Sequence, residues 1–413
     1  MSKIDSKLCS QDLCTGCFAC KQACAKGAIQ ITKVKGFLYP KIDSSLCVDC
    51  GLCTKVCPVI TTKPIDETYK AVHSTSTCFA TWNKDNKDRV NSSSGGVFSV
   101  LANETLRQGG IVYGAAWDTN MQLRHVGVEN IDELDSLRRS KYVQSSTDGI
   151  YTDVKHQLQA GKQILFCGTP CQICGLLSFL RYKDYHNLIT VGVVCHGVPS
   201  QWSFDKWIRE IEEKDKIKVD GCNFRSKQYG WRTGLNLSLH GKDERKKEIK
   251  VNKITAENSY FNAFLKQYFL RESCYNCPFK ENINMANADI MLSDFWSLWS
   301  VIPWREVDWG KGVSAVVTNT EKGNAFLERC KGSLVMKERP YSEYASNTGL
   351  RNARKPKNND EAFEFLKTNT WEETQSKFFP LKLSNKLPVY TRILLGENIS
   401  ILIKKIMKKI TRR

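Results

Sequence analysis

The sequence predicts a small cysteine-rich α+β domain, a larger α/β domain with a mostly parallel sheet, and a basic C-terminal helix. More than half of the 18 cysteines precede residue 80. Strand-like and helix-like apolar segments alternate after residue 77, which is typical of an α/β domain. The last fifteen residues have the spacing of a basic amphipathic helix. We therefore expect domains at residues 1–66, 67–335 and 336–413.

Composition and charge narrow the class of protein. The chain has 413 residues, with 61 Lys and Arg against 43 Asp and Glu, so its formal net charge is +18. This charge favours an acidic partner, an anionic ligand or an anionic membrane surface. The N-terminus has no apolar signal-peptide core, and no apolar stretch is long enough to span a membrane. We expect a reducing, cytoplasmic location, where clustered cysteines indicate metal binding or redox chemistry.

Residues 1–60 contain an internal repeat. Residues 13–24 and 46–57 share one cysteine pattern at an offset of 33 residues. Between the copies, apolar residues from Ile29 to Ile42 predict a hairpin that turns at Lys35-Gly36. The polar, proline-containing stretch Thr61–Glu67 predicts a linker.

Each copy of the repeat has the spacing C-x2-C-x2-C-x3-C. In two-cluster bacterial ferredoxins, the first three cysteines of such a run bind one [4Fe-4S] cluster and the fourth binds the other. A pair of zinc knuckles is the alternative, but it tolerates this spacing poorly. Cys9 lies outside the motif, and we interpret it as a spare thiol. The spacing predicts two clusters, one held by Cys14, Cys17, Cys20 and Cys57 and the other by Cys47, Cys50, Cys53 and Cys24.

The second domain is predicted from its periodicity. A Ser/Gly loop at residues 91–96 and a turn at residues 168–172 each precede helical spacing. Residues 336–386 are polar and charge-rich, which predicts irregular or loosely helical structure. The expected strands are residues 78–82, 111–117, 163–166 and 188–194, and the expected helices are residues 97–107 and 173–180.

The later cysteines leave two interpretations open besides buried, inert thiols. Cys167, Cys171 and Cys174 have the C-x3-C-x2-C spacing with which radical SAM enzymes hold a cluster. Alternatively, one cysteine of this run joins Cys195 and the Cys274–Cys277 pair in a third cluster. Cys171 and Cys195 each follow a predicted strand, where open α/β sheets place ligands.

Six separated motifs carry a resemblance to a known family. They are Ser94–Val97, Ser140–Ser145, Leu165–Gln172, Val194–Ser200, Arg271–Pro278 and Ala288–Trp296. In this order they resemble the coenzyme F-420 hydrogenase/dehydrogenase beta-subunit family. With its N-terminal ferredoxin, the chain is similar to bacterial members found among polysaccharide-biosynthesis genes. The resemblance implies a flavin, FAD, in the α/β core, and a third [4Fe-4S] cluster held by Cys171, Cys195, Cys274 and Cys277.

Several residues of these motifs suit the implied flavin. The Ser/Gly loop offers N–H groups and hydroxyls at a helix N-terminus, where a phosphate binds favourably, although an ordinary helix cap is the alternative. Lys141 can neutralise a phosphate or a reduced flavin, and His196 can donate a proton to the substrate. The expected cofactor-binding residues are Ser94, Gly95, Gly96, Lys141, Gly168 and Thr169, and the expected catalytic residue is His196.

Together these features predict an oxidoreductase. We expect electrons to pass from a donor such as ferredoxin through [4Fe-4S] clusters to FAD and then to a small organic substrate. Analogy with relatives suggests a glycan precursor. A radical SAM enzyme and a non-catalytic electron-transfer subunit are the alternatives.

The tail Ile399–Arg413 fits contact with anionic lipid at the inner face of the membrane, or docking on the protein itself. Nucleic acid is not an expected partner, because the chain has no recognised nucleic-acid-binding module.

Overall fold

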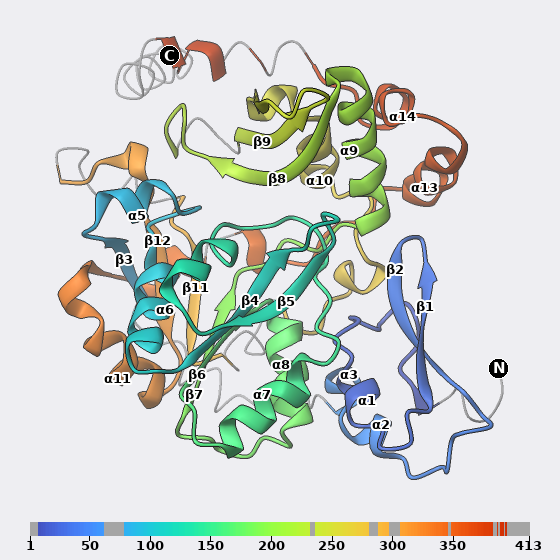
Figure 1. Ribbon diagram of the computed structural model, residues 1–413, viewed down its shortest axis with the longest axis vertical. Coiled ribbons are helices and arrows are strands. Elements are labelled where there is room, and N and C mark those ends of the chain that lie inside the picture. The colour runs from blue at the N-terminus through green and yellow to red at the C-terminus, as the bar shows by residue number, and fades with distance from the viewer. Residues whose placement is uncertain are drawn as a thin grey trace, which may run out of the picture.

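The computed structural model describes residues 7–61, 78–231, 236–280, 288–296, 306–345, 348–382, 386, 389–391 and 393–394. The predicted basic helix at residues 399–413 lies outside the described residues. Among the described helices, none is long and apolar enough to cross a membrane. Figure 1 shows the N-terminal domain beside a central sheet of eight strands, and a second sheet of three strands lies above the central one.

The N-terminal domain consists of a hairpin and short helices. β1 (Ile29–Val34) and β2 (Phe37–Ile42) pair as antiparallel strands. Lys35 and Gly36 have positive φ angles of 51° and 79°, which suit a tight turn between twisted strands, so the predicted hairpin is confirmed. The short helices within or after the cysteine runs are α1 (Ala19–Gln22), α2 (Leu52–Lys55) and α3 (Pro58–Thr61).

The central sheet is mixed, which corrects the prediction of a mostly parallel sheet. Its strands are β3 (Cys78–Asn83), β4 (Ile111–Trp117), β5 (Leu123–Val128), β6 (Ile164–Gly168), β7 (Leu188–Val193), β11 (Ile290–Asp294), β12 (Ser314–Thr318) and β13 (Leu334–Arg339). Their order is β13-β3-β12-β11-β7-β6-β4-β5. Only β11, β7, β6 and β4 pair in parallel, whereas the strands at both edges pair antiparallel. Periodicity identifies strands, but it does not reveal the direction of a strand that joins an edge.

Helices cover both faces of the central sheet. They are α5 (Asn86–Val90), α6 (Val97–Arg107), α7 (Ile150–Gln159), α8 (Pro170–Phe179) and α11 (Glu321–Arg329). α6 and α11 contribute Leu101 and Phe326 to one apolar core, and α7 and α8 contribute Val154 and Leu176 to another. The predicted strands and helices of this region are confirmed. α8 begins before residue 173 because Thr169 and Gln172 form a capping box at its N-terminus.

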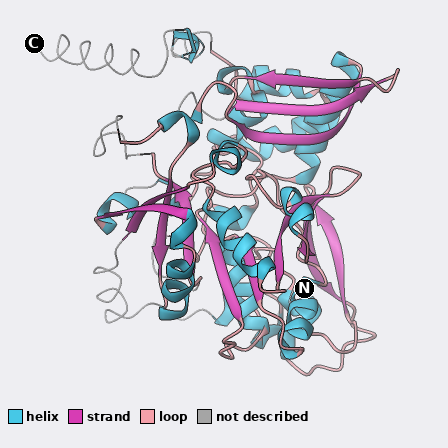
Figure 2. Ribbon diagram, turned by 60° about the vertical axis from the view of Figure 1, so that its left-hand side comes forward, coloured by secondary structure: helices cyan, strands magenta, loops and turns pink. Residues whose placement is uncertain are grey.

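A second layer, which the sequence did not predict, packs above the central sheet (Figure 2). It consists of the antiparallel strands β8 (Ile217–Ser226), β9 (Asn236–Asp243) and β10 (Glu248–Lys253), with helices α9 (Gln201–Asp215), α10 (Ser259–Leu265), α13 (Asn359–Thr368) and α14 (Trp371–Phe378). Phe363 and Trp371 of the last two helices are buried in its core. Residues 336–386, expected to be irregular or loosely helical, are partly helical, but α13 and α14 are packed into a core rather than loose. The expected boundary after residue 335 falls inside β13.

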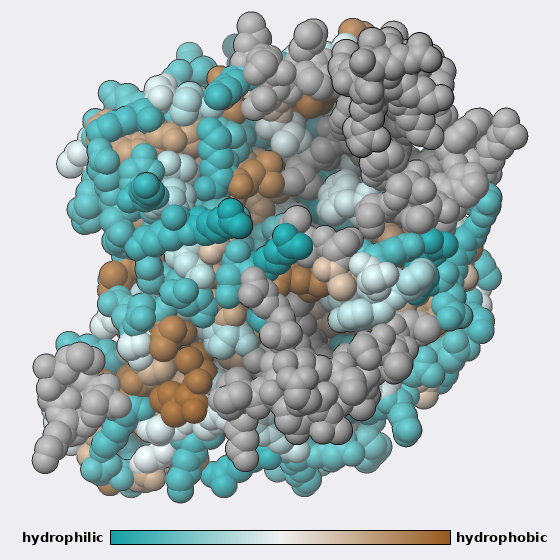
Figure 3. Space-filling view, turned by 180° about the vertical axis from the view of Figure 1, so that it is seen from behind, coloured by the Kyte–Doolittle hydropathy of each residue, from teal (hydrophilic) through white to brown (hydrophobic). Residues whose placement is uncertain are grey.

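The remaining elements are short. They are α12 (Tyr341–Ala345) and the 3-10 helices η2 (Ile131–Ser136), η4 (Thr255–Glu257), η5 (Glu272–Cys274), η8 (Trp309–Lys311), η9 (Lys331–Ser333) and η10 (Thr348–Leu350). Seen from behind, the described surface is mostly hydrophilic, with apolar residues gathered in a few separate patches (Figure 3).

Candidate functional site

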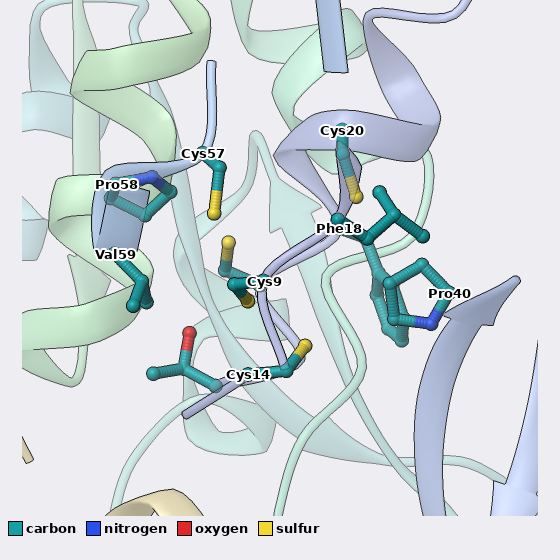
Figure 4. A pocket seen from close by; sticks show the side chains of 11 residues that line it. Cys9, Cys14, Phe18, Cys20, Pro40, Cys57, Pro58 and Val59 are labelled. Atoms are coloured by element: carbon teal, nitrogen blue, oxygen red, sulfur yellow. The ribbon is translucent and has the colours of Figure 1, made fainter. Parts of the chain in front are cut away.

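Five of the N-terminal cysteines line a single cavity. Cys14, Cys17, Cys20 and Cys57 surround it, together with Phe18 and Pro58. Figure 4 shows the sulfur atoms of Cys14, Cys20 and Cys57 directed toward this common space. These are the four residues that the spacing assigned to one cluster. The ligand set fits a [4Fe-4S] cluster, because four thiolates from separate parts of the chain converge on one space.

Cys9 also reaches this cavity, although we interpreted it as a spare thiol outside the motif. Its thiol is hydrogen-bonded to Cys14 and Cys57, and this contact is the main reason that the pKa of Cys14 falls to about 6. The same contact lowers the pKa of Cys57 to about 7. The four-residue gap between Cys9 and Cys14 does not match the ferredoxin spacing, so the motif alone gave no sign of this contact.

The other four cysteines of the repeat are more accessible. Cys24, Cys47 and Cys53 are half-buried against Ile29 and Ile42, and Cys50 is exposed. The two predicted cluster sites thus differ in environment. The site of Cys14 is mostly buried, whereas the site of Cys50 is open to solvent.

The first cysteine cavity lies directly against helix α8 of the central sheet. A Cβ atom added at Gly175 of α8 would lie 2.8 Å from the Cβ of Cys17 and 3.1 Å from its sulfur. The Thr147 hydroxyl donates to the carbonyl of Cys17 at 2.8 Å. Close packing therefore holds this cavity against the helix that also carries Cys171.

Cys171, Cys195, Cys274 and Cys277 come together from separate segments. Burial, and then the nearby thiol of Cys277, raise the pKa of Cys171 well above its ordinary value. Burial raises the pKa of Cys274 to about 11 and that of Cys277 to about 12, and each thiol opposes ionisation of its neighbours. Mutual repulsion of this kind requires that the sulfurs lie close together.

The buried ammonium group of Lys280 beside these cysteines indicates that an anion binds at this site. Lys280 is 6% exposed, and its Nζ atom has no hydrogen-bond partner among the described residues. Its charge favours ionisation of Cys274 and Cys277, opposing the rise in their pKa that burial causes. A buried cation needs a compensating charge, and a [4Fe-4S] cluster with four thiolates, at about −2 when oxidised, would supply it. The residues therefore fit a third cluster.

Cys167 does not join this group. It lies at the end of β6. Burial raises its pKa to about 12, and the charged group that opposes this rise is Lys141, with no cysteine among the causes. The radical SAM interpretation needs Cys167 together with Cys171 and Cys174, so this placement argues against it.

Within the described part of the chain, no three His, Cys, Asp or Glu side chains are arranged to hold a single metal ion.

A larger cavity of about 630 Å³ adjoins the third cysteine group. It opens at the carboxyl ends of the parallel strands, where Gly168 of β6, Val193 of β7 and Asp294 of β11 line it. Phe264 of α10 and Arg225 of β8 form the opposite wall. Cys195 lines the cavity as well, so the group of Cys171, Cys195, Cys274 and Cys277 borders the cavity. Open α/β sheets place ligands at this position, and the volume is that of a site for a drug-sized molecule or cofactor.

Most of the predicted cofactor-binding residues line this cavity. The residues that do so are Ser94, Gly96, Lys141, Gly168, Thr169 and the predicted catalytic His196. Gly95 is not among the lining residues. Its N–H donates to the Ser314 hydroxyl at 2.9 Å, and a Cβ there would lie 2.3 Å from the carbonyl of Thr81. This glycine permits close packing of the loop on the sheet, and a role for Gly95 in cofactor binding stays a prediction.

The wall around Lys141 carries several cations. Arg138, Arg139 and Arg225 line the cavity beside it. These three arginines pair with Asp88, Asp135 and Asp294, respectively. The Lys141 ammonium donates to the carbonyls of Arg138 and Arg139 at 2.8 and 3.3 Å. Burial, and then the charge of Arg139, lower the pKa of Lys141 to about 7. An anionic group such as a phosphate would match this wall.

Two polar residues of the cavity were missed by the sequence analysis. Arg225 and Asp294 form an ion pair, and Arg225 also donates to the Tyr142 hydroxyl at 3.1 Å. The Arg225 guanidinium lies over the ring of Trp296, which stacks on Trp231 with centroids 4.5 Å apart. Asp294 and Trp296 stand in a quoted motif, but Arg225 stands in none, so only the fold brings it to the site.

His125 is a further cavity residue without a sequence signal. Its Nε2 lies 3.1 Å from the carbonyl of Cys167 and therefore carries the proton, while Nδ1 accepts from the Ser145 hydroxyl at 3.0 Å. Ser145 in turn accepts from the Gln172 amide at 2.9 Å. Burial lowers the pKa of His125 to about 4, so its imidazole is neutral at pH 7.

His196 follows Cys195 and faces the cavity, with its ring 6.3 Å from that of Phe264. Enclosure by the cavity walls, and then the charge of Lys280, lower its pKa. Its surface is open toward the cavity interior, so a ligand can reach the ring.

Two family models and one curated relative match parts of this chain. Residues 161–343 match the family described as the C terminus of the coenzyme F420 hydrogenase/dehydrogenase beta subunit, and residues 13–60 match the 4Fe-4S dicluster domain. A coenzyme F420-dependent sulfite reductase of Methanocaldococcus jannaschii is 25% identical over 331 residues. The match covers 72% of this chain and 47% of that protein, so the chain spans about half the length of this relative.

A solved structure is also similar. A chain of the F420-reducing [NiFe] hydrogenase complex from Methanosarcina barkeri aligns with 81% of this chain and 97% of its own length, at 17% identity and a TM-score of 0.43. The family matches confirm the resemblance that the motifs predicted, and they confirm the N-terminal iron–sulfur domain.

Proposed function

We propose that this chain is an iron–sulfur flavoenzyme, because residues 161–343 match the coenzyme F420 hydrogenase/dehydrogenase beta-subunit family and residues 13–60 match a 4Fe-4S dicluster domain. It transfers electrons between an external one-electron carrier and an organic substrate. The observation that carries the proposal is the adjacency of three sites. The cavity of Cys14 touches α8, α8 carries Cys171, and Cys195 of the same cysteine group lines the large cavity.

The exposure of the cysteines suggests the order of electron transfer. The cluster at Cys50 is nearest to solvent, and the neighbouring side chains of Leu46 and Val48 are 49% and 61% exposed. An external carrier such as a ferredoxin would dock there. Cys14, Cys17, Cys20 and Cys57 would hold the next cluster, at a buried site that would link the exposed Cys50 site to the third cysteine group.

The large cavity has the size and charge for a flavin, and we propose FAD. A flavin exchanges single electrons with iron–sulfur clusters and pairs of electrons with organic substrates. Lys141 and the neighbouring arginines hold the negative charge of the cofactor, and the imidazole N–H of His196 offers a proton to the substrate. A glycan-precursor substrate, and with it a role in polysaccharide biosynthesis, stays a prediction, because neither relative carries such a name.

The name of the sulfite reductase favours a second candidate for the cavity. That relative is named for its dependence on coenzyme F420, so this deazaflavin is the alternative ligand. It would occupy the same cavity.

Analysis of the protein purified without oxygen tests the proposal. We expect about twelve irons per chain, four for each of three clusters, and one flavin that mass spectrometry identifies as FAD. Lys141→Met should retain the iron and lose most of the flavin, whereas Lys162→Met, at an exposed position outside the cavity, should retain both. Isolation of the deazaflavin instead would establish the second candidate. Protein without iron would refute both.

A further inference from the structure

Arg271 lies at the junction between the N-terminal domain and the rest of the molecule. It opens the motif that contains Cys274 and Cys277, and it is 1% exposed. Its guanidinium donates from Nε to the carbonyl of Cys14 at 2.6 Å, and from its two other nitrogens to the Gln144 side chain at 2.9 Å and the carbonyl of Leu38 at 3.1 Å. One side chain thus joins segments 257, 127 and 233 residues away in sequence.

The approach is close because the first cysteine loop has no side chain at Gly16. A Cβ there would lie 2.8 Å from a terminal guanidinium nitrogen, and the φ angle of +70° also favours glycine. The guanidinium also packs over the ring of Tyr39, with 4.0 Å to the ring centroid. Aromatic packing and hydrogen bonds therefore hold the charge in one position.

The Arg271 guanidinium donates to two backbone carbonyls and one amide oxygen, all of them uncharged, and it forms no ion pair with a carboxylate among the described residues. The Cys14 thiol, whose pKa falls to about 6, is the neighbouring group that can carry a negative charge. The adjacent Glu272 pairs with Lys355 instead. A guanidinium does not lose its proton in a protein, and a buried cation without a counter-charge is strongly unfavourable. A compensating anion should therefore lie close to Arg271.

The two buried cluster sites are placed to provide this negative charge. Arg271 donates to the backbone of Cys14, and the N–H of Cys274 donates back to the Arg271 carbonyl at 2.9 Å within η5. The positive charge of Arg271 favours ionisation of the Cys14 thiol and of the Cys274 thiol. Each [4Fe-4S] cluster with four thiolates is an anion, and its charge grows by one when it is reduced.

We propose that Arg271 is the shared counter-cation of the Cys14 cluster and the Cys274 cluster, and that it raises the reduction potential of both. This inference rests on the proposed function, because it requires clusters at these two sites. An electron on either cluster is stabilised by the same fixed charge. Transfer between them therefore does not require a charged group to move.

Potentiometric titration of the anaerobic protein, monitored by electron paramagnetic resonance, tests the inference. In Arg271→Gln, two of the three cluster potentials should become more negative, and the third, that of the exposed Cys50 cluster, should stay unchanged. Lys280→Met removes a cation that acts on Cys274 and Cys277, so it should lower one potential only. Arg89→Gln is the matched control, because Arg89 is 3% exposed and donates to backbone carbonyls of Gly312 and Asp308, away from the cysteines.

The outcomes separate this inference from the proposed function. Wild-type protein without iron would refute the proposed function. Full iron with three unchanged potentials in Arg271→Gln, or with all three shifted equally, would overturn the role of Arg271. If the glutamine variant loses iron, Arg271→Lys decides, because it keeps the charge and removes two donors. Near-wild-type potentials in that variant support charge compensation, whereas both potentials falling despite the retained charge would contradict it.

Discussion

Arg225 and Asp294 form a two-point ion pair, with nitrogen–oxygen distances of 2.7 and 3.0 Å, that joins the second sheet to the central sheet. Arg225 stands on β8 and Asp294 ends β11. Their side chains are 3% and 15% exposed, and both line the large cavity. The pair therefore sets the relative position of the two cavity walls.

Removing the cation of this pair should destabilise the fold. Arg225→Met leaves the Asp294 carboxylate without its partner in a mostly buried place, so we expect the free energy of unfolding to fall by about 3–5 kcal/mol. Urea unfolding followed by circular dichroism measures this. Lys331→Met breaks the exposed pair with Glu328 and should change stability by less than about 1 kcal/mol. Equal losses in the two variants would contradict the structural role of the buried pair.

The iron content of two cysteine variants distinguishes the interpretations of the core cysteines. Cys274→Ser should reduce the iron from about twelve to about eight atoms per chain, because one cluster loses a ligand. Cys167→Ala should leave the count unchanged, since Cys167 stands apart from the group. Loss of four irons in Cys167→Ala, with no loss in Cys274→Ser, would instead favour a radical SAM site.

Local periodicity was enough to predict individual elements. Val97, Val100 and Leu101 have helical spacing, and α6 buries all three residues against the central sheet. Their apolar character alone decides which side of the helix faces inward. The paired cysteine runs likewise predicted four of the five cysteines of the first cavity, because the spacing of ligands within each run is a local property.

The elements and contacts that the sequence did not reveal depend on distant partners. The alternation of β10 is short, with only Ile249 and Val251 apolar, none of its residues is fully buried, and a run of charged residues precedes the strand. α13 is polar in composition, yet Phe363 and Leu366 suffice to anchor it. The burial of Arg271 arises from neighbours on three separate segments, which no local pattern encodes.

Gly175 provides a test of the packing between the N-terminal domain and α8. In an open helix, glycine to alanine stabilises by roughly 0.5–1 kcal/mol. Here the new methyl group would meet Cys17 and the Tyr151 hydroxyl, each at 2.8 Å, so Gly175→Ala should instead destabilise by about 1–3 kcal/mol. It should also alter the paramagnetic signal of the Cys14 cluster.

The control for this variant is Gly332→Ala, where nothing lies within 4 Å of the added atom. Its unfolding midpoint in urea should match that of the unmodified protein. A stabilising effect of Gly175→Ala would show that α8 and the cysteine loop are not in close contact.

Binding of the anionic cofactor should depend on pH through Lys141. Burial, then the charge of Arg139, lower the pKa of Lys141 to about 7 in the cofactor-free cavity, and a bound anion favours the charged form. Below pH 7 the Lys141 side chain is already protonated, so the affinity of the protein for the cofactor should be nearly constant. Above pH 7 binding must take up a proton, so affinity should fall by up to about tenfold per pH unit.

Flavin titration of the cofactor-free protein between pH 6 and 9 measures this dependence. In Lys141→Met, binding should be weaker throughout, and the decline that begins near pH 7 should disappear. An unchanged decline in the variant would assign the titration to another group.

The electron path itself is tested most directly by mixing the anaerobic protein with chemically reduced ferredoxin and following the flavin absorbance with time. We predict rapid flavin bleaching in the unmodified protein, and in Cys274→Ser a full complement of flavin that the ferredoxin no longer reduces at a comparable rate. Bleaching at the unmodified rate in a variant that has lost its third cluster would contradict the account.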